Sequence, residues 1–138
     1  MPKLIKIFVS RAGMSTRLRL RDEKNDPGDA ELTTDADPGD TIVWELDPKS
    51  TKNPPDPGFF PIGSIVDIKR SKPTDGPRYA NSVAVLDTDP IQGPNGTFIG
   101  TVKNPSVGAG RAEDYMITYT LPGESGVFEQ DPKIQMNS

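Results

Sequence analysis

Prolines and glycines punctuate the whole chain, and they limit its fold more than any other feature of the sequence. Fifteen prolines and thirteen glycines are spread over 138 residues without a repeating pattern. Proline interrupts helices because it lacks a backbone donor, whereas glycine permits the positive φ angles of tight turns. This spacing is typical of short strands joined by turns and argues against long helices. The apolar runs between the turns are too regular for a disordered chain.

Between the turn formers, apolar and polar side chains alternate with the period of two that indicates half-buried β-strands. In the first run, Ile5, Ile7 and Val9 occupy every second position. In the second, Leu18 and Leu20 alternate with arginines. Runs of this kind predict strands at residues 4–9, 17–21, 42–46, 65–68, 82–85, 98–102, 115–121 and 133–136.

Short turn motifs and two long connections separate the predicted strands. Asn95-Gly96 is the strongest hairpin signal, because both residues accept positive φ. The long connections span residues 47–61 and 104–113, and long loops often carry binding sites. Turn motifs occupy residues 26–29, 37–40, 93–96 and 121–123. We therefore predict a single all-β sandwich domain over residues 1–138, with about eight or more strands and little or no helix.

Charge and composition exclude several classes of function. The formal net charge is −4 and the acidic residues are scattered, so the chain has no basic footprint for nucleic acid or for an anionic membrane. It contains no Cys and no His. Disulfides, thiol chemistry and thiolate metal sites are therefore excluded, and the commonest general base and transition-metal ligand are also missing.

The N-terminal apolar run, residues 4–9, is broken by Lys6 and followed by Arg11. It is too short and too charged for the hydrophobic part of a signal peptide, and no apolar stretch reaches transmembrane length. We expect no membrane association. On the chain as given we expect a cytoplasmic protein, or a periplasmic one if a leader was removed.

Two stretches carry a recognisable β-sandwich pattern. In residues 38–44, Pro-Gly-Asp-Thr-Ile-Val-Trp, a Gly-Asp turn opens a strand that contains an aromatic core residue. Near the C-terminus, the aromatic strand 115–119, a loop and the closing strand 131–136 form a last hairpin. These features resemble the cupredoxin family. The resemblance implies a Greek-key, cupredoxin- or immunoglobulin-like sandwich of two sheets.

The resemblance does not extend to copper. Cupredoxins hold copper with one mid-chain His and with Cys, His and usually Met around the final loop. Here the final loop, residues 120–130, contains none of these residues. We expect Leu121, Val127 and Phe128 to pack into the space beneath the loop instead. We also expect Met116 and Met136 to lie in the core and to bind no metal.

A second resemblance is to the bacterial inclusion-body protein family, whose members are non-catalytic β-sandwich proteins. It rests on Glu31-Leu32, on residues 39–44 and on the terminal Asp131-Pro132-x-Ile134. This resemblance also implies a protein without catalytic residues.

Catalysis and calcium binding both lack a matching motif. Without His or Cys, catalysis needs a carboxylate pair, a Ser–Lys arrangement or metal-activated water, yet most acidic residues lie in turns. Asp35, Asp37 and Asp40 lie close together, but they do not follow the EF-hand calcium pattern. We interpret them as a Pro-Gly hairpin turn with solvated acids and predict no structural calcium.

Arg17, Arg19 and Arg21 share one face of a predicted strand. Three guanidinium groups in a row can bind a carboxylate- or phosphate-bearing partner. A ladder of this kind also protects an exposed edge strand from pairing with another chain. We predict an edge strand with buried leucines and exposed arginines.

Three other motifs contain residues of the kind that form contact sites. Trp44 lies on the apolar side of its strand and is predicted to be core. Phe59 and Phe60 lie in a Pro-rich loop, where an exposed pair would suit a dimer or partner contact. Asn95-Gly96-Thr97 matches the N-glycosylation pattern, but we interpret it as a turn.

The sequence therefore predicts a non-catalytic binding or assembly module on a copper-free cupredoxin-like fold, with no catalytic, cofactor or metal residues. The expected contact is a protein partner or a second copy, through the Phe59–Phe60 loop or the arginine face. The alternative is a small carboxylate-based or Ca²⁺-dependent enzyme or binding protein. The two hypotheses differ in whether an Asp or Glu pair converges in a concave pocket.

Overall fold

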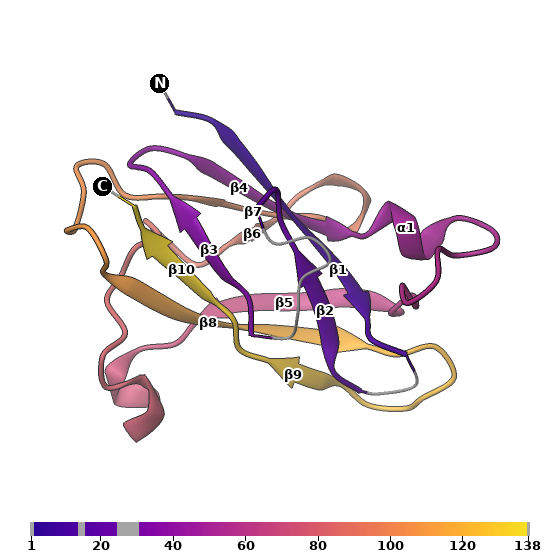
Figure 1. Cartoon of the computed structure of the whole chain (residues 1–138). Helices are drawn as coiled ribbons and strands as arrows, with labels where there is room; N and C mark the ends of the chain where they lie inside the picture. The colour runs from indigo at the N-terminus through magenta and orange to yellow at the C-terminus, as the bar shows by residue number, and fades with distance from the viewer. Residues whose placement is uncertain (1, 14–15, 25–30, 138) are drawn as a thin grey trace.

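The computed structural model describes residues 2–13, 16–24 and 31–137, and it confirms an all-β sandwich (Figure 1). Ten strands of the described chain form two mixed sheets. The first sheet has the order β2 (Leu18–Arg21), β1 (Leu4–Arg11), β4 (Thr41–Leu46), β7 (Phe98–Thr101) and β6 (Ile91–Gln92). The second has the order β3 (Thr33–Ala36), β10 (Lys133–Met136), β8 (Ala112–Thr120) and β5 (Ser64–Arg70), and β9 (Phe128–Gln130) also pairs with β8.

Helical structure is confined to short turns, as the proline and glycine spacing predicts. The helical elements of the described residues are α1 (Pro48–Thr51) and three 3₁₀ turns, η1 (Pro73–Asp75), η2 (Pro77–Tyr79) and η3 (Pro94–Gly96). Each begins with a proline, which is favoured in the first turn because its missing N–H would have no partner there. None of the described helices has the length and apolar character needed to cross a membrane.

The core lies between the two sheets and is built from the inward side chains of each strand. On β8, every second residue from Glu113 to Tyr119 is buried. Trp44 of β4 is fully buried, which confirms its predicted core position. Its Nε1 donates to the Tyr115 hydroxyl at 3.0 Å, and the two rings meet edge-on with centroids 5.3 Å apart. Gly100 lies against the indole, where a Cβ atom would come within 3.2 Å of the ring.

Two predicted turns form as expected. Asn95 and Gly96 have φ angles of 57° and 76°, and they connect β6 to β7 as a hairpin. The 121–123 turn closes with a bond from the Glu124 N–H to the Leu121 carbonyl. The turn predicted at residues 26–29 lies outside the described residues.

The 37–40 turn forms, but it is not the hairpin that the sequence predicts. Gly39 has a φ of 84° and the Asp40 N–H donates to the Asp37 carbonyl at 3.1 Å, so the chain does turn tightly here. However, the turn joins β3 of the second sheet to β4 of the first. It is therefore a corner between the sheets, and not a hairpin.

Residues 82–85 do not form the predicted strand. Leu86, which directly follows this segment, makes an isolated β-bridge to Val102. Val85 is fully buried but Val83 is only half-buried. In place of a ladder the segment makes single backbone bonds, from the Val83 N–H to the Ala112 carbonyl and from the Lys103 N–H to the Val85 carbonyl. Conversely, β3, β6 and β9 were not predicted, because they are short and lack a clean apolar alternation.

Candidate functional site

A closed loop of residues 71–82 carries the chain away from β5 and back toward β8, and it lies over the outer face of the second sheet (Figure 1, lower left). Ser82, which is buried, ties its two ends together. The Ser82 hydroxyl donates to the Ser71 carbonyl at 2.8 Å and accepts from the Asp114 N–H at 3.0 Å. The Ser71 N–H donates to the Asp114 carbonyl at 2.9 Å. A loop whose ends meet in this way is an Ω-loop, and such loops are frequently functional.

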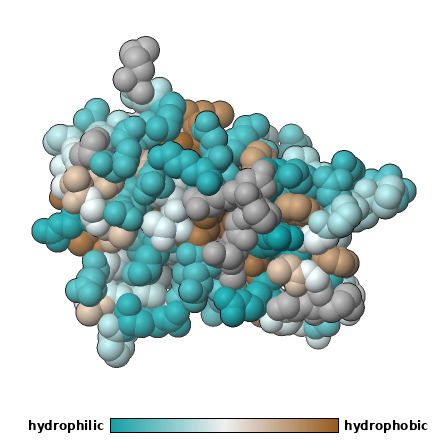
Figure 2. All heavy atoms as spheres, viewed as in Figure 1, coloured by the Kyte–Doolittle hydropathy of each residue, from teal (hydrophilic) through white to brown (hydrophobic). Residues whose placement is uncertain are grey.

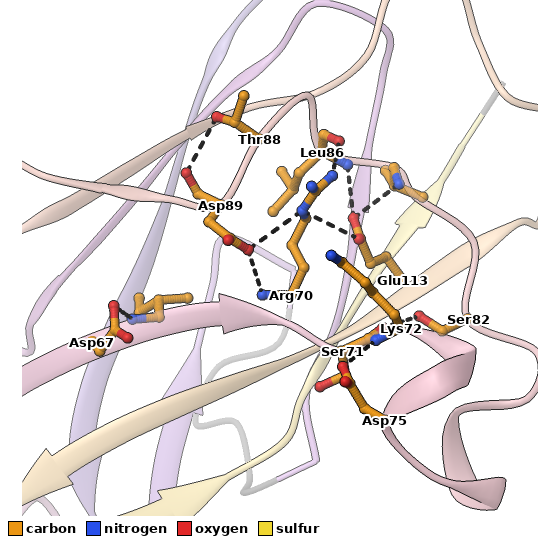
Figure 3. A network of polar contacts seen from close by, with 12 residues as sticks. Asp67, Arg70, Ser71, Lys72, Asp75, Ser82, Leu86, Thr88, Asp89 and Glu113 are labelled. Carbon is orange, nitrogen blue, oxygen red and sulfur yellow. Dashed lines mark hydrogen bonds and ion pairs between the residues drawn. The ribbon is translucent and has the colours of Figure 1, made fainter.

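Local bonds shape this loop internally. The Asp75 carboxylate accepts from the Lys72 N–H at 2.8 Å, and the Asp75 N–H returns to the Lys72 carbonyl at 2.8 Å (Figure 3). Gly76, at a φ of 157°, separates η1 from η2. The result is a fixed position for Arg78 and Tyr79 above the sheet.

A buried carboxylate anchors the segment that follows the loop (Figure 3). Glu113 faces the core, and its Oε1 accepts from the Val85 N–H at 2.9 Å and from the Leu86 N–H at 2.8 Å. The guanidinium of Arg70 lies 3.8 Å from the other oxygen and donates to the Leu86 carbonyl at 3.0 Å. These bonds replace the strand ladder that residues 82–85 were predicted to make.

Burial raises the pKa of Glu113 above its ordinary value of 4.5. The bonds from Leu86 and Val85 and the charge of Arg70 offset only part of this rise. On the far side of Arg70, the Asp89 carboxylate accepts a hydrogen bond from the Arg70 backbone N–H at 2.9 Å. Glu113 therefore holds backbone in place and is not open to a ligand, because it is only 2% exposed.

Beside the Ω-loop, the outer face of the second sheet is hollowed into a pocket of about 420 Å³, called here the Asp114 pocket. Three adjacent strands supply its floor, since Lys133 of β10 lies opposite both Thr33 of β3 and Asp114 of β8. The complete lining is Glu31, Thr33, Arg78, Tyr79, Asp114, Asp131 and Lys133. The volume is within the usual range for sites that bind small molecules.

Asp131 holds the Ω-loop against the pocket. It lies at the break between β9 and β10, where Pro132 interrupts the strand. One carboxylate oxygen, Oδ2, forms an ion pair with Arg78 and accepts from the Tyr79 hydroxyl at 3.3 Å. Burial raises the pKa of Tyr79, and the charge of Asp131 raises it further. The Tyr79 hydroxyl therefore keeps its proton and can donate it in a hydrogen bond. The other oxygen, Oδ1, accepts no hydrogen bond from any described residue.

Asp114 is a poorly satisfied acceptor. Its side chain is only 14% exposed, and its closest partner is the Lys133 ammonium at 3.8 Å. No described residue donates a hydrogen bond to its carboxylate. Burial raises the pKa of Asp114, Lys133 lowers it, and nearby Asp131 raises it again. Two carboxylates with open acceptor positions therefore converge on one pocket.

A second hollow of about 460 Å³, the Met116 hollow, adjoins the first and shares Arg78 and Tyr79 with it. Met116 follows Asp114 by two residues on β8 and therefore points to the same face of the sheet. The remaining lining is Lys69, Arg70, Ser71, Asp75 and Glu129. Met116 is half-buried on the outer face, so its predicted core position is wrong, whereas Met136 is buried as predicted.

The arginine strand is an edge strand, as predicted, and Leu18 and Leu20 are buried. The prediction of exposed arginines is wrong for Arg21, whose side chain is 11% exposed. Its Nε and Nη2 donate to the fully buried Asp47 carboxylate at 2.6 and 2.9 Å. Arg19 is half-buried, donates to the Gly58 carbonyl at 2.5 Å and stacks on Phe59.

The predicted exposed pair Phe59–Phe60 is only half correct. Phe59 is buried beneath cations, with the Arg19 guanidinium 4.6 Å and the Lys49 ammonium 5.0 Å from its ring centroid. Phe60 is 38% exposed, but its backbone pairs with Arg11. On the face shown in Figure 2, hydrophobic residues form only small separate patches among hydrophilic ones.

Asp40 is fully buried, so the interpretation of solvated acids in this turn is wrong for that residue. Its carboxylate accepts from the Lys3 N–H at 2.9 Å and from the Asp37 N–H at 2.8 Å. The carboxylate therefore fastens the corner to the start of β1. Among the described residues, no three acidic side chains gather where a metal ion would be held.

Two of the three apolar residues of the final loop pack against the core. Leu121 is buried and Phe128 stacks on Tyr119 with ring centroids 6.0 Å apart, in line with the predicted packing. Val127 is 57% exposed, so its predicted packing is wrong. The residues present do not fit a blue-copper centre, since they include neither a thiolate nor an imidazole.

Sequence reasoning missed the pocket residues Arg78, Tyr79, Asp114 and Asp131. Asp114 directly precedes the predicted strand 115–121, but nothing in the pattern of that strand indicated that Asp114 shares a pocket with Asp131. One available signal was the break in the closing strand at Asp131-Pro132, because proline leaves neighbouring polar groups unpaired.

Fold and site together define a class, an all-β sandwich with a polar, ligand-sized pocket on the outer face of one sheet. A scan of the chain against models of known protein families found no match, and a search of curated proteins found none either.

Proposed function

We propose that the protein is a non-catalytic binding module that holds a small polar ligand in the Asp114 pocket. The observation that carries this proposal is the pair of incompletely bonded carboxylates, Asp114 and Asp131, in a concave, ligand-sized site. Partly buried acceptors without donors are costly, and a ligand that donates hydrogen bonds removes that cost. The proposed site differs from the Phe59–Phe60 loop and the arginine face, whose aromatic and guanidinium groups largely contact each other.

The same proposal includes a cupredoxin-like arrangement of the sandwich without its copper ligands. It is supported by the buried Trp44 after the 37–40 corner and by the packing of that ring on Tyr115 of β8. In such an arrangement the functional surface has moved from the final loop to the outer face of the second sheet.

Binding is favoured over catalysis because both carboxylates have basic partners. Asp131 is paired with Arg78 and hydrogen-bonded to Tyr79, and Asp114 lies near Lys133. A nucleophile or general base has to be free to move toward its substrate's reacting atom, whereas Asp131 is held by Arg78 and Tyr79.

A carboxylate-based enzyme is the second candidate, favoured by one observation. The charge of Asp131 contributes to the raised pKa of Asp114, so a carboxyl group with a raised pKa lies beside a second carboxylate in the pocket. Such a pair can divide the roles of acid and base. Turnover of a bound compound that is lost in the Asp114→Asn variant would favour this candidate.

The binding proposal is tested by recording amide NMR spectra while adding simple sugars, amino acids and small amines separately. At least one class is expected to shift the amide signals of Thr33, Asp114 and Lys133. Asp114→Asn should weaken that binding at least tenfold, whereas the exposed control Asp87→Asn should not change it. The proposal is wrong if no class shifts these amides, or if Asp114→Asn binds as the natural chain does.

A further inference from the structure

We infer that the ligand is a neutral oligosaccharide that occupies both the Asp114 pocket and the Met116 hollow; this rests on the proposed function. The two cavities share Arg78 and Tyr79 in their linings, so they adjoin at these two residues. Asp114 and Met116 lie two residues apart on one strand, which places the two floors about 7 Å from each other. A ligand longer than one unit therefore reaches both.

The charges along the two cavities favour a neutral ligand with many hydroxyl groups. The combined lining carries charges of both signs in similar number, namely the cations Lys69, Arg70, Arg78 and Lys133 and the carboxylates Glu31, Asp75, Asp114, Glu129 and Asp131. A hydroxyl group both donates and accepts hydrogen bonds, so it can satisfy either sign. A ligand with a strong net charge would be repelled by half of this lining.

The Met116 hollow offers contacts of the kind that a second sugar unit requires. Met116 provides a half-buried apolar floor, and Lys69 and Glu129 stand on the neighbouring strands β5 and β9. No ion pair or hydrogen bond joins the Lys69 ammonium or the Glu129 carboxylate to another described residue. Addition of a peptide strand is disfavoured, because both cavities lie on the face of the sheet, whereas strand addition pairs with the backbone at a sheet edge.

Two structural details give the pocket a defined shape before a ligand arrives. Asp131 fixes Arg78 and Tyr79 between the cavities, and the Ser82 bonds hold both ends of the Ω-loop. A preformed site loses less conformational freedom on binding.

The test is a glycan array that carries neutral and acidic glycans of one to six units, together with synthetic peptides. We expect binding to a neutral glycan series, with affinity that rises at least tenfold between one and three or four units. In solution, the Met116 methyl NMR signal should shift with the longer members and not with the single unit. The double variant Lys69→Ala/Glu129→Gln should remove the gain from length, whereas Asp87→Asn should keep it.

The possible failures are separable. If only amines or amino acids shift the Thr33, Asp114 and Lys133 amides, the binding function stands and the oligosaccharide inference is wrong. If neutral glycans shift these amides but the affinity does not rise with length and Met116 does not respond, the two-cavity assignment is wrong. If peptides bind and glycans do not, the ligand class is wrong. If nothing shifts the pocket amides, the proposed function itself fails.

Discussion

Buried carboxylates stabilise this protein by accepting hydrogen bonds from backbone N–H groups that the strands leave without partners. Asp40 does so for Lys3 and Asp37 at the corner between the sheets, and Glu113 does so for Val85 and Leu86. An unsatisfied buried N–H costs about 1–3 kcal/mol, so each carboxylate permits a chain path that regular pairing would not. These residues are therefore structural, in contrast with Asp114, whose acceptor capacity is largely unused.

Replacing Arg21 tests the buried ion pair with Asp47. Arg21→Ala should destabilise the fold by about 3 kcal/mol, because it leaves the fully buried Asp47 carboxylate without its cation. Urea unfolding measures the change. Arg17→Ala, directly before the same strand, is the control, with an expected loss of less than about 0.5 kcal/mol at this exposed position. Equal effects for the two variants would contradict the assignment.

Replacing Glu113 tests its raised pKa. Between the ordinary value of 4.5 and the raised value, the folded state binds more protons than the unfolded state. The contribution of Glu113 to the free energy of unfolding therefore falls as pH rises through this window. We expect the stability of the natural chain relative to Glu113→Gln to decline with rising pH above 4.5, measured by urea unfolding at several pH values. A relative stability that rises with pH would show a lowered pKa instead.

At the residue scale, the sequence predicts burial better than it predicts partners. The period of two placed Trp44, Leu18 and Leu20 correctly inside. It could not show that Arg21 meets Asp47, because they lie 26 residues apart on elements whose spatial order the pattern does not contain. Asp114 and Asp131 were missed for the same reason.

At the scale of elements, side chains take over where backbone pairing stops. The segment after Ser82 crosses from the second sheet to the first, held by Glu113 and Arg70 on one side and by the bridge from Leu86 to Val102 on the other. The closing strand is divided into β9 and β10 by Asp131-Pro132, which frees Asp131 to bind the Ω-loop. Each irregularity positions part of the proposed site.

Replacing Ser82 tests the Ω-loop. Ser82→Ala should leave the Ser71 carbonyl and the Asp114 N–H without their shared partner, at a cost of about 1–3 kcal/mol. Because the loss is local, amide hydrogen exchange should speed up most in residues 72–81. The nearby exposed Thr88→Ala is a matched hydroxyl control with little expected effect. Exchange that speeds up equally throughout the chain would contradict a separately anchored loop.

Replacing Phe128 tests the packing beneath the final loop. The sequence predicted that Phe128 packs beneath the loop, and its ring is half-buried against Tyr119. Phe128→Ala should therefore destabilise the fold by about 1–3 kcal/mol, below the range for a fully buried Phe. Val127→Ala, at a 57% exposed position, should cost less than about 0.5 kcal/mol. A loss above 4 kcal/mol, or no loss at all, in thermal unfolding of Phe128→Ala would refute this packing.

The elements that could be predicted are those whose own side chains alternate. The eight predicted runs include seven that lie in observed strands, whereas β3 has the polar sequence Thr-Thr-Asp-Ala and forms by parallel pairing with β10. Residues 82–85 show the opposite case, since Val83 and Val85 alternate in the sequence but the segment forms no strand. Local pattern therefore predicts strands that carry core residues and misses those that neighbouring strands impose.

At the scale of the whole molecule, the two sheets have different outer surfaces. The outer side of the first sheet is covered near its edge by stacked arginine and phenylalanine side chains, which contact one another. The outer side of the second sheet is hollowed beside the Ω-loop. The pocket joins residues from four distant parts of the chain, around residues 31–33, 78–79, 114 and 131–133. Sequence alone predicted the sandwich but could not bring these parts together.

Isothermal titration calorimetry with the strongest neutral glycan of the array tests the central claim, that the outer face of the second sheet is a binding site. The natural chain, Asp114→Asn and the control Asp87→Asn would be titrated under identical conditions. We predict one site per chain, a loss of at least tenfold in affinity for Asp114→Asn, and no change for Asp87→Asn. Equal affinities for the natural chain and Asp114→Asn would show that the ligand binds elsewhere.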